Sequence, residues 1–220
     1  TNITENHMNE HESFESYAYQ KSKVWRFQKK GDYSILNMDD DVSRQCLDNS
    51  PQPSLKKEGV SRVITFSIKE KADVYIKNNQ IFVHDEYILD LSDIKIPGKH
   101  NIENVLAAVA ATYFAGVKPE IIREAIADFR GVEKRLQFIG EVDGIRFYND
   151  LSSTTPTSTI AAIKAFENAS SITLILGGDD KNLKYEDLVE VINEKVDTLI
   201  LMEGTVVEKI APLIKGVWGF

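Results

Sequence analysis

The second half of the sequence alternates between short apolar runs and longer stretches with helical spacing, and this alternation most limits the possible folds. The short runs are rich in β-branched residues, as strands are, and the stretches between them repeat apolar residues every three or four positions. An order of strand, helix, strand, helix, strand is typical of a parallel sheet with crossover helices. The expected elements of this sheet are Ile145–Asn149, Thr157–Phe166, Ile172–Leu176, Tyr185–Lys195, Thr198–Met202 and Val206–Ile214.

The first half of the chain shows a different order of elements. Helical spacing comes first, followed by short β-rich runs and then by two more helical stretches. Asn78 and Asn79 separate two of the short runs, and asparagine tolerates the positive φ that a tight hairpin turn requires. We therefore expect helices together with a small antiparallel sheet. The expected elements are a helix in Glu12–Lys29, a strand at Tyr33–Asn37, a helix from Asp39, a meander of Val63–Ser67, Asp73–Ile76, Gln80–Val83 and Tyr87–Leu91, and helices at Ile102–Phe114 and Pro119–Phe129.

The change between the two patterns predicts a domain boundary near Gly131 to Arg135. Residues 1–132 and 133–220 would then form two α/β domains, and 220 residues are enough for two cores. The sequence begins without a methionine and ends on aromatic residues that no further helix covers. We therefore expect it to be an excerpt of a longer protein, cut at both ends.

The formal net charge of −8 makes two classes of partner improbable on physical grounds. Nucleic acids and anionic membranes both bind basic faces, so we expect neither. The chain has no apolar run near the roughly 20 residues that span a bilayer, and its single cysteine, Cys46, can form no internal disulfide. We expect a soluble protein in which a phosphate group binds in a local pocket.

Polar residues follow two neighbouring strands of the predicted parallel sheet. The first strand is followed by Asp150 and then by hydroxyl side chains up to Thr157, and the second is followed by Gly177-Gly178-Asp179-Asp180-Lys181. Ligands of open α/β sheets bind beyond the carboxyl ends of strands, where a loop meets the N-terminus of a helix. These residues therefore predict a site for a small charged substrate beside a nucleotide.

Several of the charged residues have two interpretations. The carboxylate of Asp150 can bind ribose hydroxyls or a cation, or it can cap the following helix. Arg135 can hold a phosphate or form a surface ion pair between domains. Lys181 lies in a loop that its two glycines make permissive, so its ammonium can reach an anion.

Two carboxamides lie at the start of the helix predicted at Ile102–Phe114. Asn101 and Asn104 are three residues apart and therefore share a helix face. A carboxamide offers a donor and an acceptor together, as an adenine edge requires. The alternative is that Asn101 caps the helix and that Asn104 is solvated.

Residues near the N-terminus are ambiguous in the same way. His7, His11 and Lys21 can bind a metal ion or serve as ordinary polar residues. The triplet Asp39-Asp40-Asp41 is interpreted as a solvated helix cap rather than as a metal cluster, because consecutive side chains on a helix point in different directions.

Taken in order along the chain, these motifs resemble those of one family, the Mur ligases. The likeness covers nearly the whole chain, and the ordered series is far more specific than any single motif. The motifs are Asn2-Ile3-Thr4-Glu5-Asn6-His7-Met8-Asn9, Tyr17-Ala18-Tyr19-Gln20-Lys21, Gly98-Lys99-His100-Asn101 with Asn104, Lys134-Arg135, Asn149-Asp150 with Thr154, and Leu176-Gly177-Gly178-Asp179-Asp180-Lys181.

The resemblance implies an enzyme that forms amide bonds with ATP and Mg²⁺. The implied fold is a partial Mur-ligase central domain followed by a Rossmann-like C-terminal domain. In that family a carboxylate is phosphorylated and the acyl phosphate is attacked by an amine, so negative charge accumulates and cations are needed. The likeness is greatest to the member that adds D-glutamate to UDP-N-acetylmuramoyl-L-alanine in peptidoglycan synthesis, which implies a monomer in a bacterial cytoplasm.

The resemblance also assigns roles to individual residues. His7 would be a magnesium ligand, and Lys21 would be the lysine that the family carries as a carbamate, an anionic oxygen ligand suited to a hard cation; both would be catalytic. The remaining assignments are Asn101 and Asn104 to the nucleotide, Arg135 to its phosphate, Asp150 to its ribose, and Thr154 and Lys181 to the carboxylate of the incoming amino acid.

Two departures from the family pattern leave alternatives open. The usual Asp-Ser-Lys-Ala-Thr-Asn is replaced here by Asp150-Leu151-Ser152-Ser153-Thr154-Thr155, and serine at 152 removes a cation. Another Mur-type or folylpolyglutamate-synthase-like ligase is therefore the alternative. The glycine-rich phosphate loop does not occur in residues 1–220, so we expect this chain to be inactive by itself. A non-catalytic α/β binding module is the third hypothesis.

Overall fold

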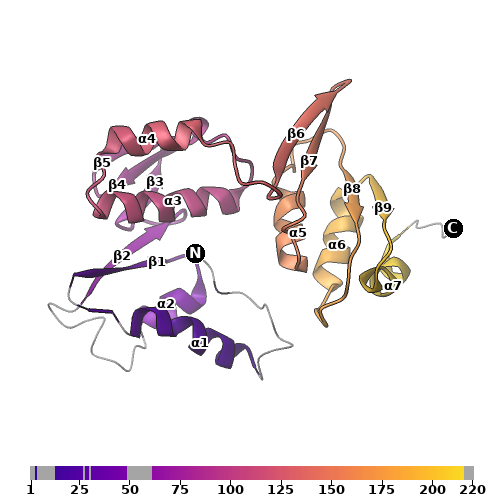
Figure 1. The fold of residues 1–220 in the computed structure, drawn as a ribbon, viewed down its shortest axis with the longest axis horizontal. Coiled ribbons are helices and arrows are strands. Elements are labelled where there is room, and N and C mark those ends of the chain that lie inside the picture. Colours follow the sequence, from indigo (N-terminus) through magenta and orange to yellow (C-terminus); the bar gives the residue numbers. More distant parts are fainter. Residues whose placement is uncertain (1–2, 4–12, 27, 30, 49–60, 216–220) are drawn as a thin grey trace. The chain divides into compact units, whose positions relative to one another are not determined.

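The computed structural model describes residues 3, 13–26, 28–29, 31–48 and 61–215. These residues belong to two compact units, and the chain passes from the first to the second between Arg130 and Gly131. Each unit is considered by itself (Figure 1). The prediction that residues 1–132 bind the nucleotide and residues 133–220 bind the amino acid concerns function, and it stays a prediction.

Helices surround a sheet in the first unit, and local signals explain where several of them begin. Ser13 accepts a hydrogen bond from the amide of Ser16 at 3.2 Å and so caps the first helix, as its residue type favours. Pro119 opens the last helix, where its missing N–H costs nothing. The elements are α1 (Phe14–Arg26), β1 (Asp32–Asn37), α2 (Asp41–Asp48), β2 (Ser61–Ser67), β3 (Val74–Lys77), β4 (Gln80–Val83), β5 (Glu86–Asp90), a 3₁₀ turn (Leu91–Asp93), α3 (Lys99–Phe114) and α4 (Pro119–Asp128).

The sheet of this unit has the order β1-β2-β3-β4-β5 and is mixed. The pairs β3–β4 and β4–β5 are antiparallel, and Asn78 and Asn79 turn between β3 and β4 with φ of 52° and 60°, as predicted. The strand β2 is parallel to both of its neighbours, so the predicted antiparallel meander is wrong for Val63–Ser67. The strands β1 and β2 are separated in the sequence by α2. A local sequence pattern does not indicate which distant strand will be the partner.

The core of the first unit lies between this sheet and the helices α3 and α4. The helix α3 packs on β1, β2 and β3, and α4 packs on β5, an arrangement that can be followed in Figure 1. Small and branched side chains alternate on the buried faces, which lets helix and sheet approach closely. The hydrophobic side chains of this unit with no exposed surface are Phe66, Val74, Ile81, Val83, Ile88, Leu89, Leu106, Val109 and Ala110.

The second unit contains an antiparallel hairpin and a parallel pair of strands. The strands β8 and β9 are parallel and are joined by α6, which confirms the predicted crossover. The elements are β6 (Gln137–Val142), β7 (Ile145–Asn149), α5 (Pro156–Lys164), β8 (Thr173–Leu176), α6 (Glu186–Lys195), β9 (Thr198–Leu201), α7 (Thr205–Ile210) and a 3₁₀ turn (Ala211–Leu213).

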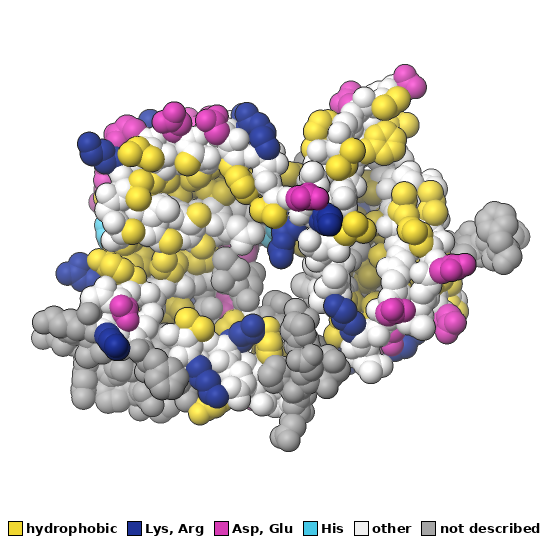
Figure 2. Space-filling view, viewed as in Figure 1, with side chains coloured by type: hydrophobic (Ala, Val, Ile, Leu, Met, Phe, Trp, Pro, Cys, Tyr) yellow, Lys and Arg dark blue, Asp and Glu magenta, His cyan; other side chains and the backbone are white. Residues whose placement is uncertain are grey.

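The strand β7 does not join the parallel pair, which corrects the sequence prediction. It pairs in antiparallel fashion with β6, a strand that was not expected. The signal for this hairpin was present, since Asp143 and Gly144 form a two-residue turn in which both φ values are positive, 51° and 79°. Hydrophobic side chains gather on the outer surface of the hairpin (Figure 2), and Phe138 and Phe147 are each 51% exposed.

Helices α5 and α6 supply most of the buried side chains of the second unit. Ile163 packs with Leu188 and Ile192, and a neighbouring cluster joins Val189 to α7.

None of the helices in residues 13–26, 31–48 and 61–215 has the length and apolar character that crossing a membrane would require.

Candidate functional site

Two loops that follow the parallel strands β8 and β9 lie against each other. Gly178 and Gly204 have φ of 118° and 148°, in the region that favours glycine. A Cβ atom on Gly204 would lie 2.6 Å from the carbonyl carbon of Gly178, which is closer than side chains approach a backbone. The amide of Val206 donates to the carbonyl oxygen of Gly178 at 3.1 Å. The loop at 177–181 is thereby fixed to the start of α7.

The carboxylate of Asp180 ties this loop to its surroundings. Its Oδ1 accepts from the Tyr185 hydroxyl and from the Asn182 amide, each at 2.9 Å, and its Oδ2 pairs with the ammonium of Lys209. The amide of Asp180 donates to Thr205 Oγ1 at 2.9 Å. The hydrogen bond from Lys209 is the main cause that lowers the pKa of Asp180, whereas burial and then the contact with Asp180 raise the pKa of Tyr185.

Lys181 follows this anchored carboxylate directly. Its side chain is exposed, and no ion pair found among the described residues includes it. The strand-end loop therefore presents a cation that forms no ion pair with the residues that the structure describes. Whether this cation binds an amino acid's carboxylate stays a prediction.

The loop that follows β7 is organised by Asp150. Its Oδ1 accepts from the amide of Leu136 at 3.0 Å, and its Oδ2 accepts from the hydroxyl of Ser153. Leu136 follows Arg135, so the backbone beside the predicted phosphate ligand and the carboxylate of the predicted ribose ligand are joined by a hydrogen bond. The side chain of Arg135 is exposed. The alternative in which Asp150 caps the next helix is wrong, because Thr155 holds that position.

Thr154 precedes the N-cap residue of α5 and is exposed. The helix begins at Pro156, one residue earlier than predicted. Thr155 and Ser158 hydrogen-bond each other's backbone amides, at 3.3 Å and 3.1 Å, which forms a capping box. Thr154 therefore sits on a well-defined helix start, with its own side chain directed by no hydrogen bond among those found in residues 61–215.

The carboxamides at the start of α3 form a short chain of hydrogen bonds. The Nδ2 of Asn101 donates to the carbonyl oxygen of Pro97 at 2.6 Å, and the Nδ2 of Asn104 donates to Oδ1 of Asn101 at 3.3 Å. Gly98, and not Asn101, is the N-cap residue. Asn104 is exposed and keeps its carbonyl oxygen outside these two bonds. The two residues share a face, as predicted, and their contact with adenine stays a prediction.

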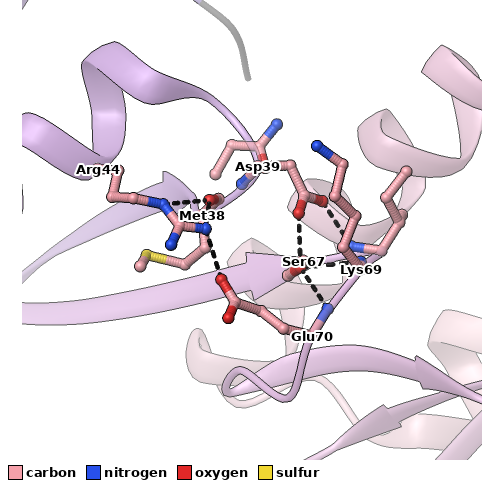
Figure 3. A network of polar contacts seen from close by, with 8 residues as sticks. Met38, Asp39, Arg44, Ser67, Lys69 and Glu70 are labelled. Atoms are coloured by element: carbon pink, nitrogen blue, oxygen red, sulfur yellow. Dashed lines mark hydrogen bonds and ion pairs between the residues drawn. The ribbon is translucent and has the colours of Figure 1, made fainter.

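The aspartate triplet lies beyond the end of β1, and two of its carboxylates accept hydrogen bonds from the protein; those of Asp39 are drawn in Figure 3. Asp40 caps α2 through the amide and the hydroxyl of Ser43, at 2.8 Å and 2.7 Å, as predicted. Asp39 is not a solvated cap, because its carboxylate accepts from Ser67 Oγ at 2.8 Å and from the Ile68 amide at 2.7 Å. It therefore links the ends of the parallel strands β1 and β2.

The predicted metal ligands are described only in part. His7 and His11 lie outside the described residues, whereas Lys21 is exposed on α1 with its Nζ 5.3 Å from the ring centroid of Tyr17. Within the described part of the chain, no three His, Cys, Asp or Glu side chains come together as metal ligands would. Lys21 has the access to solvent that carbamate formation requires.

Two family models match this chain in sequence. The Mur ligase middle domain matches residues 1–112, and the Mur ligase glutamate ligase domain matches residues 134–216. The chain belongs to the Mur ligase family. Among curated Mur ligases, it is 37% identical over 210 residues to the UDP-N-acetylmuramoylalanine–D-glutamate ligase of Thermoanaerobacter sp. strain X514. This match covers 93% of the chain and 44% of that relative, so the chain spans less than half of its length.

Solved Mur ligase structures share the fold. MurF from Acinetobacter baumannii superimposes with a TM-score of 0.77 at 21% identity, over 97% of this chain and 48% of that one. MurF from Thermotoga maritima, solved in complex with ADP, gives a TM-score of 0.62 at 15% identity, over 93% of this chain and 52% of that one. At these identities the likeness concerns the fold alone.

Several residues that hold these loops in place were not found from the sequence. Ser153 could have been, because a hydroxyl three residues after Asp150 is a common local partner. Tyr185 and Lys209 could not be paired with Asp180 in advance, since the pairing with Lys209 depends on where α7 packs. The sequence predicted which loops carry polar side chains but not which partners their carboxylates bind.

Proposed function

We propose that the protein catalyses the ATP-dependent addition of D-glutamate to UDP-N-acetylmuramoyl-L-alanine, a step of peptidoglycan precursor synthesis. The observation that carries this proposal is the match to both Mur ligase domains together with the 37% identity to a relative that bears this activity in its name. The reaction would take place in a bacterial cytoplasm, with the protein acting as a monomer and with neither nucleic acid nor membrane as partner.

Each unit would supply a separate part of the reaction. Residues 1–132 would bind ATP, and residues 133–220 would bind the incoming amino acid. The first part resembles a nucleotide domain in its mixed sheet covered by α3 and α4, and the second presents loops at strand ends, where α/β domains bind ligands. Closing such domains on a substrate places the amine beside the activated carboxylate.

Four residues would bind the nucleotide. Asn104 is suited to the adenine because its side chain is exposed and is aligned by Asn101. Arg135 would bind a phosphate through its exposed guanidinium. Asp150 would accept from the ribose hydroxyls, since a carboxylate has about four lone-pair sites and the protein itself occupies two of them.

His7 and Lys21 would hold Mg²⁺, with Lys21 as a carbamate. The fit can be judged at Lys21, whose exposed side chain can lose a proton to water so that its neutral amine can add to carbon dioxide, and whose carbamate oxygens would be the hard ligands that Mg²⁺ prefers. The ion would offset the negative charge of the phosphates. We assign no further ligand to it.

Thr154 and Lys181 would bind the carboxylate of the amino acid. Both are exposed, both follow strands of the second unit, and Lys181 is a cation without an internal partner among the described residues. The reaction would begin with transfer of a phosphoryl group from ATP to the terminal carboxylate of UDP-N-acetylmuramoyl-L-alanine. The free amine of D-glutamate would then attack the acyl carbon, and phosphate would leave as the amide bond forms.

Phosphate release by the protein expressed from its complete coding region tests the proposal. Release is expected only when ATP, Mg²⁺, UDP-N-acetylmuramoyl-L-alanine and D-glutamate are all present. The variant Lys181→Ala should raise the KM for D-glutamate by about tenfold or more, because a charge-assisted contact is lost. Equal turnover with another amino acid in place of D-glutamate would contradict the specificity.

The second candidate is another Mur-type or folylpolyglutamate-synthase-like ligase, and Ser152 favours it. The family lysine that Ser152 replaces would have added a cation to the amino-acid site. A screen of amino acids against acceptor carboxylates separates the two candidates. A complete coding region without a glycine-rich phosphate loop would instead support a non-catalytic binding module.

A further inference from the structure

Lys181 is next in sequence to the carboxylate of Asp180, which can compete with a ligand for the ammonium of Lys181. Asp180 precedes it in the chain, in a loop whose backbone is held by Gly178 and by Thr205. A lysine beside an unneutralised carboxylate in a fixed loop tends to form an internal ion pair, and its ammonium is then less available to a ligand. The availability of Lys181 therefore depends on what Asp180 already binds.

None of the contacts found for the Asp180 carboxylate among the described residues is with the ammonium of Lys181. The carboxylate takes one ammonium from Lys209, one hydroxyl from Tyr185 and one amide from Asn182. The side chain of Asp180 is 11% exposed and that of Lys209 is 47% exposed, so the carboxylate is shielded from water while the ammonium remains in contact with it. The ammonium of Lys209 is the group that neutralises its charge.

We propose that Lys209 is a positioning residue that occupies Asp180 and thereby keeps Lys181 available for the carboxylate of the incoming amino acid. This inference rests on the proposed function of Lys181. It assigns to α7, which carries Lys209, a part in amino-acid binding without any contact to the substrate. Removing Lys209 should leave the carboxylate of Asp180 short of one cation, and Lys181 is the cation closest in sequence.

The activity test uses the protein from its complete coding region, with D-glutamate as the probe. Lys209→Met should raise the KM for D-glutamate roughly three- to tenfold while kcat and the KM for ATP stay near their original values. Lys209→Arg keeps the charge and should restore most of the affinity. Lys195→Met is the matched control, because Lys195 forms an exposed ion pair with Glu194 in the same unit.

The double variant Asp180→Asn/Lys209→Met separates competition from a merely structural role. The carboxamide introduced by Asp180→Asn carries no charge to capture Lys181, so the double variant should recover a KM for D-glutamate close to that of Asp180→Asn alone. A structural role predicts instead that Asp180→Asn alone raises the KM for D-glutamate about as much as Lys209→Met does, because either change breaks the same pair. That result, or an unchanged KM in Lys209→Met, would overturn the proposal.

A second measurement requires no ligase activity. In the 220-residue chain, limited acetylation followed by peptide mass spectrometry reports how accessible each lysine amine is. Lys181 should react more slowly in Lys209→Met than in the original chain and should regain its reactivity in the double variant. Unchanged acetylation of Lys181 in Lys209→Met contradicts the inference, whatever substrate the enzyme uses. If acetylation of Lys181 is slower in Lys209→Met but the protein from the complete coding region does not add D-glutamate, only the proposed function is refuted.

Discussion

Asp39, Asp150 and Asp180 each lie in the loop that follows a strand, and each accepts hydrogen bonds from the protein itself. At the scale of single residues, these carboxylates fix the loops in which they lie. Arg135 and Lys181, which are both exposed, are the cations of these loops that are proposed to meet a ligand. A carboxylate at a strand end is therefore a poor guide to ligand contact unless its partners are known.

Replacing Asp39 should destabilise the first unit. An asparagine side chain at this position could not accept from both the Ser67 hydroxyl and the Ile68 amide in the same way, since its Nδ2 is a donor. We expect Asp39→Asn to lower the free energy of unfolding of this unit by about 2 kcal/mol. Urea titrations followed by the amide NMR signals of the first unit measure the change. Asp85→Asn, at a side chain that is 88% exposed, is the control and should cost little.

Acidification should weaken the second unit through Asp180. The pKa of Asp180 is lowered in the folded chain, chiefly by Lys209. The ionised carboxylate of Asp180 therefore stabilises the fold above its unfolded pKa of about 4, and this stabilisation is lost as the pH falls through the lower pKa of the folded chain. In Lys209→Met the pKa of Asp180 should rise toward its ordinary value. A ¹³C NMR titration of the carboxyl group measures it. An unshifted titration in this variant would show that Lys209 does not set the pKa.

At the scale of elements, the sequence located nearly every helix and strand, because each depends on local periodicity or on a cap. It failed where pairing joins distant segments: β2 runs parallel to β1 across α2, and β7 pairs with the unexpected β6. The strand β6 carries exposed apolar side chains, so it lacks the alternation of a half-buried strand. The Asp143-Gly144 turn was the sequence signal that indicated this strand.

The contact between the loops after β8 and β9 predicts an unequal response to two glycine substitutions. Gly204→Ala places a Cβ against the backbone of Gly178 and should cost the second unit more than about 3 kcal/mol. Gly144→Ala also falls at a positive φ but meets no atom within 4 Å, and it should cost only about 1 kcal/mol. Thermal unfolding of the two variants compares them, and equal losses would show that backbone conformation alone matters.

At the scale of the whole molecule, more of the predicted site residues were assigned from the family motifs than from the spacing and type of the residues. Spacing alone left Asn101 as a helix cap and Asp150 as an even choice, and the structure shows that neither caps its helix. The partners of Asp180 come from α6 and α7 and their flanking residues, so packing had to be known first. Residue types could be predicted from the sequence, whereas their hydrogen-bond partners could not.

If one nucleotide is bound by residues of both units, ADP with Mg²⁺ should stabilise both. Asn104 belongs to the first unit, and Arg135 and Asp150 belong to the second. In the protein from its complete coding region, hydrogen exchange should slow around α3 and also in the loop after β7 when ADP is added. Asn104→Ala should reduce protection in both places. Protection confined to one unit would contradict a nucleotide shared between them.

The approach of Gly178 to Gly204 also matters to anyone who wishes to retune this enzyme by directed evolution. A library at Gly204 sets new side chains against the backbone of Gly178, whereas a side chain at Gly178 meets no atom within 4 Å and is disfavoured only by the positive φ. Asp179 and Lys181, which are exposed between fixed neighbours, tolerate variety at far lower risk. Under the proposed role of Lys181, new amine donors are best sought by diversifying these two sites while the glycine pair is left intact.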